Sequence, residues 1–169
     1  MSGSLFANAL VSGLLLAGFY AAVSVGIAIA FGMLDVVNIA HPAFILLGSY
    51  AASVANSAFG IDPILTAAAL SPAFFALGAV LYRLYHASFE RRGREPLRGL
   101  AFFFGILFVT EVALILAFGV DYRSVNTGYI GTTWRFGAVD LPLRLFVPFV
   151  VSLAMTVCVP VVTPRSAVA

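Results

Sequence analysis

Apolar residues fall along this chain in long runs, not in the short alternating patterns of half-buried strands. A helix needs roughly 20 mainly apolar residues to cross the hydrocarbon core of a bilayer. Runs of this kind predict membrane-spanning helices at residues 5–34, 43–59, 64–85, 100–119 and 143–162. The sequence therefore predicts an all-α fold, a polytopic transmembrane helical bundle formed by one domain.

Two long apolar runs between residues 13 and 50 are separated by four unusual residues, Asp35, Asn38, His41 and Pro42. Proline removes a backbone donor, and the polar groups freed at a helix break cannot stay unpaired in hydrocarbon. Such breaks persist where protein or a water-filled cavity supplies partners, and in transporters they tend to line the substrate path. We expect a broken pair of helices here, with these residues as candidates for lining a path.

Two roles fit the polar residues of this break. Asp35, Asn38 and His41 are three residues apart, so on a helix they spread over about 120° and form a polar patch that faces a cavity. Alternatively, Asp35 and Asn38 cap the helix ends, with His41 as a hydrogen-bonded neighbour. Asp and Asn commonly have this role beside proline, so the sequence favours capping, and the two roles are compatible.

Glu111 lies near the middle of the predicted span 100–119. A charge at that depth costs about 3 kcal/mol or more, so we expect Glu111 to face the interior of the bundle. There it lines a path or, as a neutral hydrogen-bonded group, serves helix packing.

Small residues in the first span recur at steps of three and four, so they form one stripe along a helix. Helices in lipid associate by close packing, and small side chains let their backbones approach. We expect this stripe to serve helix packing, although lining a conduit is the alternative. Its members are Gly13, Ala17, Ala21, Ser24, Ala28 and Gly32.

Charged residues make up only 9% of the chain, and arginines gather in one segment, at residues 86–99. Short loops rich in arginine stay on the cytoplasmic side of a membrane, so this loop is predicted to be cytoplasmic and the N-terminus outside. The clustering does not form the basic face that nucleic-acid binding requires. The arginines concerned are Arg91, Arg92, Arg94 and Arg98.

The motifs of several enzyme classes are missing from the sequence. A nucleotide-binding GxxxxGK[ST] loop needs a lysine and the chain has none, so any ATP-driven step must come from a partner. HExxH, CxxC and GxSxG motifs are absent, and Cys158 is the single cysteine. We expect a protein that is not an enzyme and that holds no cofactor or metal.

Residues 13–50 resemble the permease subunits of branched-chain amino acid ABC transporters of the high-affinity Liv type, which include relatives that carry urea and short amides. The family pattern reads approximately GLxxGxxYAL, LGxxxxFG and VVNFAHGxFxMLGAY. This chain has GLLLAGFYAA at 13–22, VGIAIAFG at 25–32 and VVNIAHPAFILLGSY at 36–50. Further on, REPLRG at 94–99 and the turn around residues 118–124 also resemble the family, so the resemblance runs from about residue 5 to about residue 155.

The resemblance implies a subunit of an importer in a bacterial plasma (inner) membrane. In such importers a second permease subunit, identical or different, completes the translocation path through the lipid bilayer. Two cytoplasmic ATP-binding subunits drive transport, and an extracytoplasmic solute-binding protein delivers the solute. The solute implied is a branched-chain amino acid or a related small polar molecule.

Two departures from the family pattern affect this interpretation. Pro42 replaces the glycine that usually follows the histidine, which stiffens the backbone beside His41. The family's chain is also longer and carries a cytoplasmic loop that docks the ATPase, so we expect a truncated or split permease that cannot couple to ATP by itself. The alternatives are an ion-coupled channel or carrier that uses Asp35 and Glu111, and a permease fragment without transport function.

Overall fold

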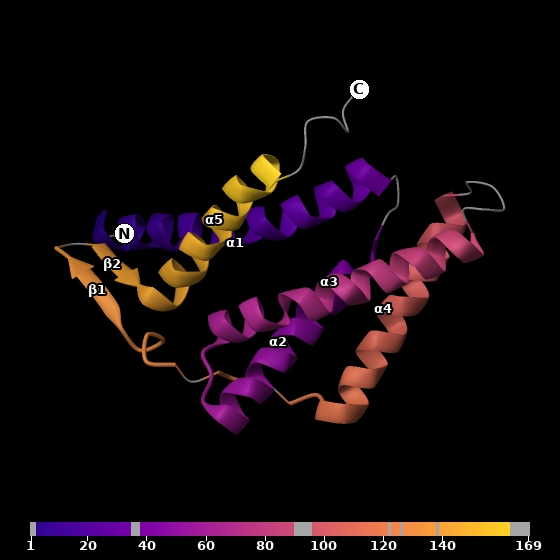
Figure 1. The fold of residues 1–169 in the computed structure, drawn as a ribbon. Coiled ribbons are helices and arrows are strands. Elements are labelled where there is room, and N and C mark those ends of the chain that lie inside the picture. The colour runs from indigo at the N-terminus through magenta and orange to yellow at the C-terminus, as the bar shows by residue number, and fades with distance from the viewer. Residues whose placement is uncertain are drawn as a thin grey trace. The chain divides into compact units, whose positions relative to one another are not determined.

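The computed structural model describes residues 3–34, 38–89, 96–121, 123–125, 127–137 and 139–162. The helices over these residues, shown in Figure 1, are α1 (Gly3–Leu34), α2 (His41–Phe59), α3 (Pro63–Ser88), α4 (Pro96–Phe118) and α5 (Leu143–Val162). A hairpin of β1 (Thr133–Phe136) and β2 (Val139–Pro142) precedes α5. The predicted all-α polytopic membrane fold is confirmed, and the hairpin is an addition that the apolar runs did not predict.

The first four helices, α1 to α4, are each long and apolar enough to cross a membrane. In α5 the described apolar stretch, Leu143–Cys158, is shorter, so the fifth span stays a prediction. Helices α1 to α4 all begin earlier than predicted, by one or two residues in α1, α2 and α3 and by four in α4. In α2, α3 and α4 a proline stands within the first two residues, where its missing N–H leaves no helical hydrogen bond unmade.

The chain divides into two compact units. The first consists of Met1–Met33 with Thr127–Ala169, and the second of Leu34–Asn126. The first unit thus contains α1, the hairpin and α5, and the second contains α2, α3 and α4. That both belong to a single membrane domain stays a prediction.

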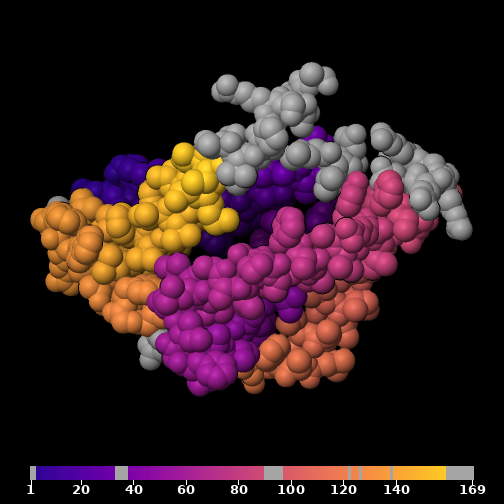
Figure 2. Space-filling model, viewed as in Figure 1, coloured from indigo at the N-terminus to yellow at the C-terminus, as the bar shows by residue number. Residues whose placement is uncertain are grey.

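In the first unit, α1 approaches α5 at a glycine. A Cβ atom added at Gly18 would collide with the ring of Phe149, so only glycine fits at this position without movement of the ring. Leu15, one turn earlier on α1, is buried. Figure 2 shows the hairpin and α5 forming one continuous surface in this unit.

The predicted small-residue stripe is not the contact surface of α1 within the first unit. All six of its members are exposed, and a Cβ added at Gly13 or Gly32 would meet no neighbouring side chain or element within 4 Å. Gly18 lies about 100° around the helix from Ala17, a stripe member, so it presents a different face to Phe149. Packing of the stripe against another chain stays a prediction.

In the second unit, α2 packs against both α3 and α4. The turn between α2 and α3 has Gly60 in the left-handed conformation, followed by Asp62, whose carboxylate accepts a hydrogen bond from the Ile64 N–H at 2.8 Å. At the other end of α3, Tyr85 lies against the start of α4, where a Cβ at Gly99 would come within 3.0 Å of the tyrosine hydroxyl. The capped turn before α3 holds it beside α2, and the contact between Tyr85 and Gly99 holds the end of α3 against α4.

Replacing Gly18 by Ala tests the contact between α1 and α5. We expect this substitution to lower the free energy of unfolding by about 1–2 kcal/mol, because the added methyl group must displace the Phe149 ring. Gly13→Ala is the matched control, since it brings the same gain in helix propensity, about 1 kcal/mol, in open space. Equilibrium unfolding in detergent measures both, and equal stability of the two variants would contradict the contact.

Candidate functional site

The break between α1 and α2 is stabilised by its own polar groups. The Asn38 Oδ1 atom accepts a hydrogen bond from the Ala40 N–H at 3.1 Å, and the Asn38 carbonyl accepts one from the His41 N–H at 3.4 Å. Such a side-chain bond to a backbone N–H two residues on is an Asx turn. His41 begins α2 half-buried and Pro42 follows it, while Asp35 lies outside the described residues.

The last residues of the break pack into the second unit. Ala40 is fully buried and forms a core cluster with Tyr85 of α3 and Phe103 of α4. Ile39 packs against the same cluster, in which the rings of Tyr85 and Phe103 are tilted to one another with their centroids 5.7 Å apart. The described part of the break is therefore attached to the α3–α4 pair and does not form a water-facing linker.

An apolar cavity of about 460 Å³, open to the surroundings, lies among the helices of the second unit. All three helices of this unit contribute to it, and Thr110 supplies the one hydroxyl group of its lining. Neither Asn38, His41 nor Pro42 lines it. The lining residues are Phe44 and Leu47 of α2, Leu77 and Leu81 of α3, and Ile106, Val109, Thr110, Ala113, Leu114, Ala117 and Phe118 of α4.

A second cavity, of about 390 Å³, lies between α2 and the loop after α4; it is lined by polar as well as apolar groups, and we call it the polar cavity. Hydroxyl groups come from α2 and two opposite charges come from the loop. The lining residues are Leu46, Ser49, Tyr50 and Ser53 of α2 and Val120, Asp121, Arg123 and Val125 of the loop. This cavity combines a carboxylate, a guanidinium and hydroxyls within one concave surface.

A series of ring contacts fixes the loop against α2. The guanidinium carbon of Arg123 lies 5.1 Å from the centroid of the Phe118 ring, and its Nη2 atom donates to the Phe118 carbonyl at 3.5 Å. The Phe118 ring in turn stacks on Tyr50, with centroids 4.8 Å apart and planes at 21°. Because Phe118 lines the apolar cavity and Tyr50 the polar one, this stacked pair connects the linings of the two cavities.

Glu111 does not face the interior of the second unit. It is exposed and lines neither cavity. Glu111 follows Thr110, so it lies about 100° around α4 from a residue that does face the apolar cavity. Glu111 thus faces away from α2 and α3, while its position in the interior of a whole bundle and its use in a path stay predictions.

The structure describes one of the four clustered arginines. Arg98 is exposed in the first turn of α4, while Arg91, Arg92 and Arg94 lie outside the described residues. Among the residues that the structure describes, no group of three His, Cys, Asp or Glu side chains is arranged to hold a metal ion. The cytoplasmic position of residues 86–99 stays a prediction.

Sequence reasoning missed the residues that make the second cavity polar. Asp121 and Arg123 stood in a turn that carried the family resemblance, but their neighbours on α2 are about 70 residues away in the chain. Ser49 and Ser53 are four residues apart, which places them on one helix face. This spacing is the feature of the sequence that could have indicated a polar surface on α2.

One characterised transport protein is similar to this chain. The high-affinity branched-chain amino acid transport system permease protein BraD of Pseudomonas aeruginosa is 29% identical over 90 residues. The aligned part makes up 53% of this chain and 29% of the relative. No family model and no solved structure matches the chain. Four helices able to cross a membrane and a distant similarity to a permease support a multi-pass membrane protein of the transport-permease kind.

The hydrogen bond accepted by Asn38 gives a testable prediction. Asn38→Ala removes the acceptor for the N–H of fully buried Ala40, so we expect a loss of about 1–2 kcal/mol in the free energy of unfolding. Faster hydrogen exchange at the Ala40 amide should accompany it. Asn38→Asp is the matched control, because it keeps an oxygen at the same position, and equal losses in both variants would contradict the acceptor role.

Proposed function

We propose that this chain is a permease subunit of an ABC importer in a bacterial inner membrane, which carries branched-chain amino acids or related small polar solutes. The observation that carries the proposal is the 90-residue similarity to a branched-chain amino acid transport permease. The apolar helices α1 to α4 agree with a membrane subunit. The absence of lysine from the sequence agrees with ATP hydrolysis by other subunits.

The assembly proposed contains a second permease subunit, two ATP-binding subunits and an extracytoplasmic solute-binding protein. The second permease, a further copy or a different chain, would complete the path with this subunit. The small-residue stripe of α1, left uncovered within its unit, suits close packing against a helix of that partner. Helices in contact through small residues can shift relative to one another, as alternating access requires.

The polar cavity is the proposed place of contact with the solute. The Asp121 carboxylate can accept hydrogen bonds from an ammonium group, and the Arg123 guanidinium can donate to a carboxylate. The Ser49 hydroxyl donates to the Leu46 carbonyl at 3.0 Å, so its oxygen can accept from a bound molecule. Opposite charges and hydroxyls in about 390 Å³ suit a zwitterionic amino acid or a small amide.

In the proposed mechanism, the stacked rings of Tyr50 and Phe118 separate during transport. A shift of α4 along α2 would separate these rings and join the polar cavity to the apolar one. The guanidinium of Arg123 would follow, because it is bonded to Phe118. The solute would then leave its polar contacts in the same step that opens the way inward.

Uptake into proteoliposomes tests the proposed function. The chain is co-expressed with the second permease, ATP-binding subunits and solute-binding protein of its own organism, and labelled leucine and urea are offered separately. We expect uptake that requires ATP and that is lost when the ATP-binding subunits lack their phosphate-loop lysine. Uptake that follows a proton gradient and ignores ATP would identify an ion-coupled carrier, and an assembled complex without uptake would refute transport.

The same assay separates the roles of two acidic residues. Asp121→Asn should lower the rate of uptake about tenfold, since a hydrogen bond to a charged group contributes roughly 1.5 kcal/mol. Glu111→Gln should leave the rate within about twofold, because a carboxylate outside both cavities forms no such bond to the solute. Loss of uptake in Glu111→Gln with normal uptake in Asp121→Asn would favour the ion-coupled alternative.

A further inference from the structure

The hairpin before α5 has one apolar and one polar face. In its register Trp134 pairs with Leu141 and Phe136 with Val139, while Arg135 pairs with Asp140. Paired residues share a face and neighbours along a strand alternate, so these two apolar pairs occupy one face. Trp134 is 49% exposed and Phe136 is 66% exposed, so their rings are only partly covered by this chain.

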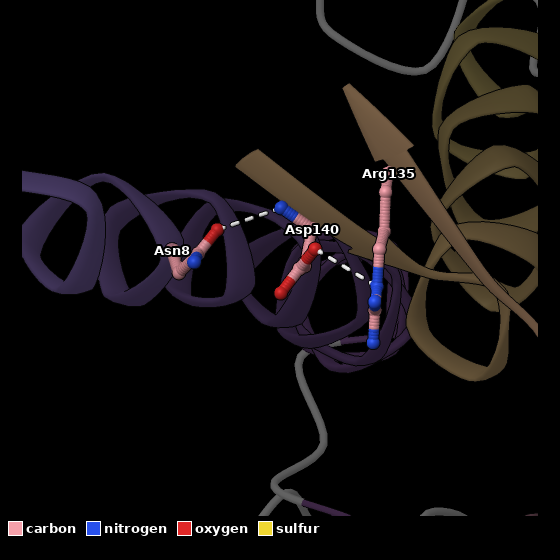
Figure 3. Close-up of polar contacts among 3 residues, drawn as sticks. All are labelled: Asn8, Arg135 and Asp140. Atoms are coloured by element: carbon pink, nitrogen blue, oxygen red, sulfur yellow. Dashed lines mark hydrogen bonds and ion pairs between the residues drawn. The ribbon is translucent and has the colours of Figure 1, made fainter. Parts of the chain in front are cut away.

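Hydrogen bonds attach this hairpin to the ends of two apolar helices. Figure 3 shows the Asn8 side chain of α1 directed at β2, where its Oδ1 atom accepts from the Asp140 N–H at 2.7 Å. At the other end the N–H of Leu143, the first residue of α5, donates to the Thr132 carbonyl at 3.1 Å. The hairpin is therefore held at the beginnings of both α1 and α5.

The length of α1 indicates how deep in the membrane the hairpin lies. Its 32 residues extend about 48 Å, against about 30 Å for the hydrocarbon core, so several turns must lie outside the core or the helix must tilt. Ser4, Asn8 and Ser12 are four residues apart and give the first turns a polar face. These first turns suit the headgroup layer, and Asn8 brings the hairpin to the same level.

We propose that the hairpin β1–β2 is a lipid-surface anchor. It lies in the headgroup layer with Trp134 and Phe136 directed toward the acyl chains. Arg135 and Asp140, which form a 3.7 Å ion pair on the opposite face with exposures of 82% and 49%, lie toward water. The inference requires a membrane protein only and does not rest on the proposed importer function.

The chemistry of both faces fits this layer. Tryptophan is enriched at membrane interfaces because its ring is apolar and its N–H needs a polar partner. The Trp134 ring lies 6.1 Å from that of Phe146 in the first turn of α5, so the apolar face continues onto this helix. Arg144, exposed in the same turn, can extend its guanidinium to lipid phosphates.

The chain contains a single tryptophan, so its fluorescence reports on this hairpin alone. The full chain is reconstituted in phosphatidylcholine vesicles that contain lipids brominated either near the headgroup or near the end of the acyl chain. We expect stronger quenching by the bromines near the headgroup and an emission at shorter wavelength than that of free tryptophan. Iodide in the water should quench the emission about threefold less than free tryptophan, because lipid covers part of the ring.

Three other outcomes would overturn the proposal. Iodide quenching equal to that of free tryptophan, without quenching by either lipid, would place the ring in water. Protection from iodide without quenching by either lipid would show that protein covers the ring, whether from this chain or a partner. Strongest quenching by the bromines at the chain end would place the hairpin within the hydrocarbon.

Two neighbouring substitutions test which face meets the lipid. Phe136→Asn should move the Trp134 emission to longer wavelength and increase iodide quenching, because it places an amide on the apolar face. Arg135→Asn, one residue away on the opposite face, is the matched control and should change neither quantity. Equal shifts in both variants would contradict the assignment of faces. If Phe136→Asn fails to fold, quenching in the wild-type chain still determines the depth of Trp134 in the membrane.

Discussion

The structure depends on one constraint, which is that a backbone interrupted in an apolar chain must find hydrogen-bond partners within the protein. In the described part of the break, Asn38 supplies acceptors to the N–H groups of Ala40 and His41. Burial of Ala40 against Tyr85 and Phe103 then ties the start of α2 to the α3–α4 pair. The position of α2, and so of both cavities, follows from this attachment.

At its middle, α2 is held by a different interaction. Tyr50 stacks on Phe118, and Arg123 lies over the Phe118 ring of that pair. Between this stack and the buried Ala40, the apolar cavity lies along the first half of α2, at Phe44 and Leu47, which is less closely packed. Close packing resists deformation, so movement of α2 costs least where packing is incomplete. A change of shape in this unit would therefore involve the first half of α2 and its aromatic stack.

The sequence predicted the helices well because lipid imposes one simple rule, a long apolar run for each span. It placed the starts of α2 and α4 too late, since it took the apolar run as the helix and gave Pro42 and Pro96 no role in starting one. The hairpin was missed because four-residue strands carry too little periodicity to be recognised. The polar cavity was missed for another reason, since contacts between α2 and a loop far along the chain leave no local pattern.

Helix α1 contacts α5 at Gly18 and not through its small-residue stripe, which shows why residue spacing alone does not predict the face by which a helix packs. Spacing identifies which residues share a face of α1, but the shape of the partner decides which face is used. Here the partner is the ring of Phe149, which fits only where α1 has no side chain, at Gly18. A stripe of small residues instead suits contact with a second helix along its whole length. The two surfaces of α1 are thus suited to different partners. Since Gly18 meets α5 and Asn8 meets the hairpin, the first unit leaves the stripe exposed, and its packing against another helix stays a prediction.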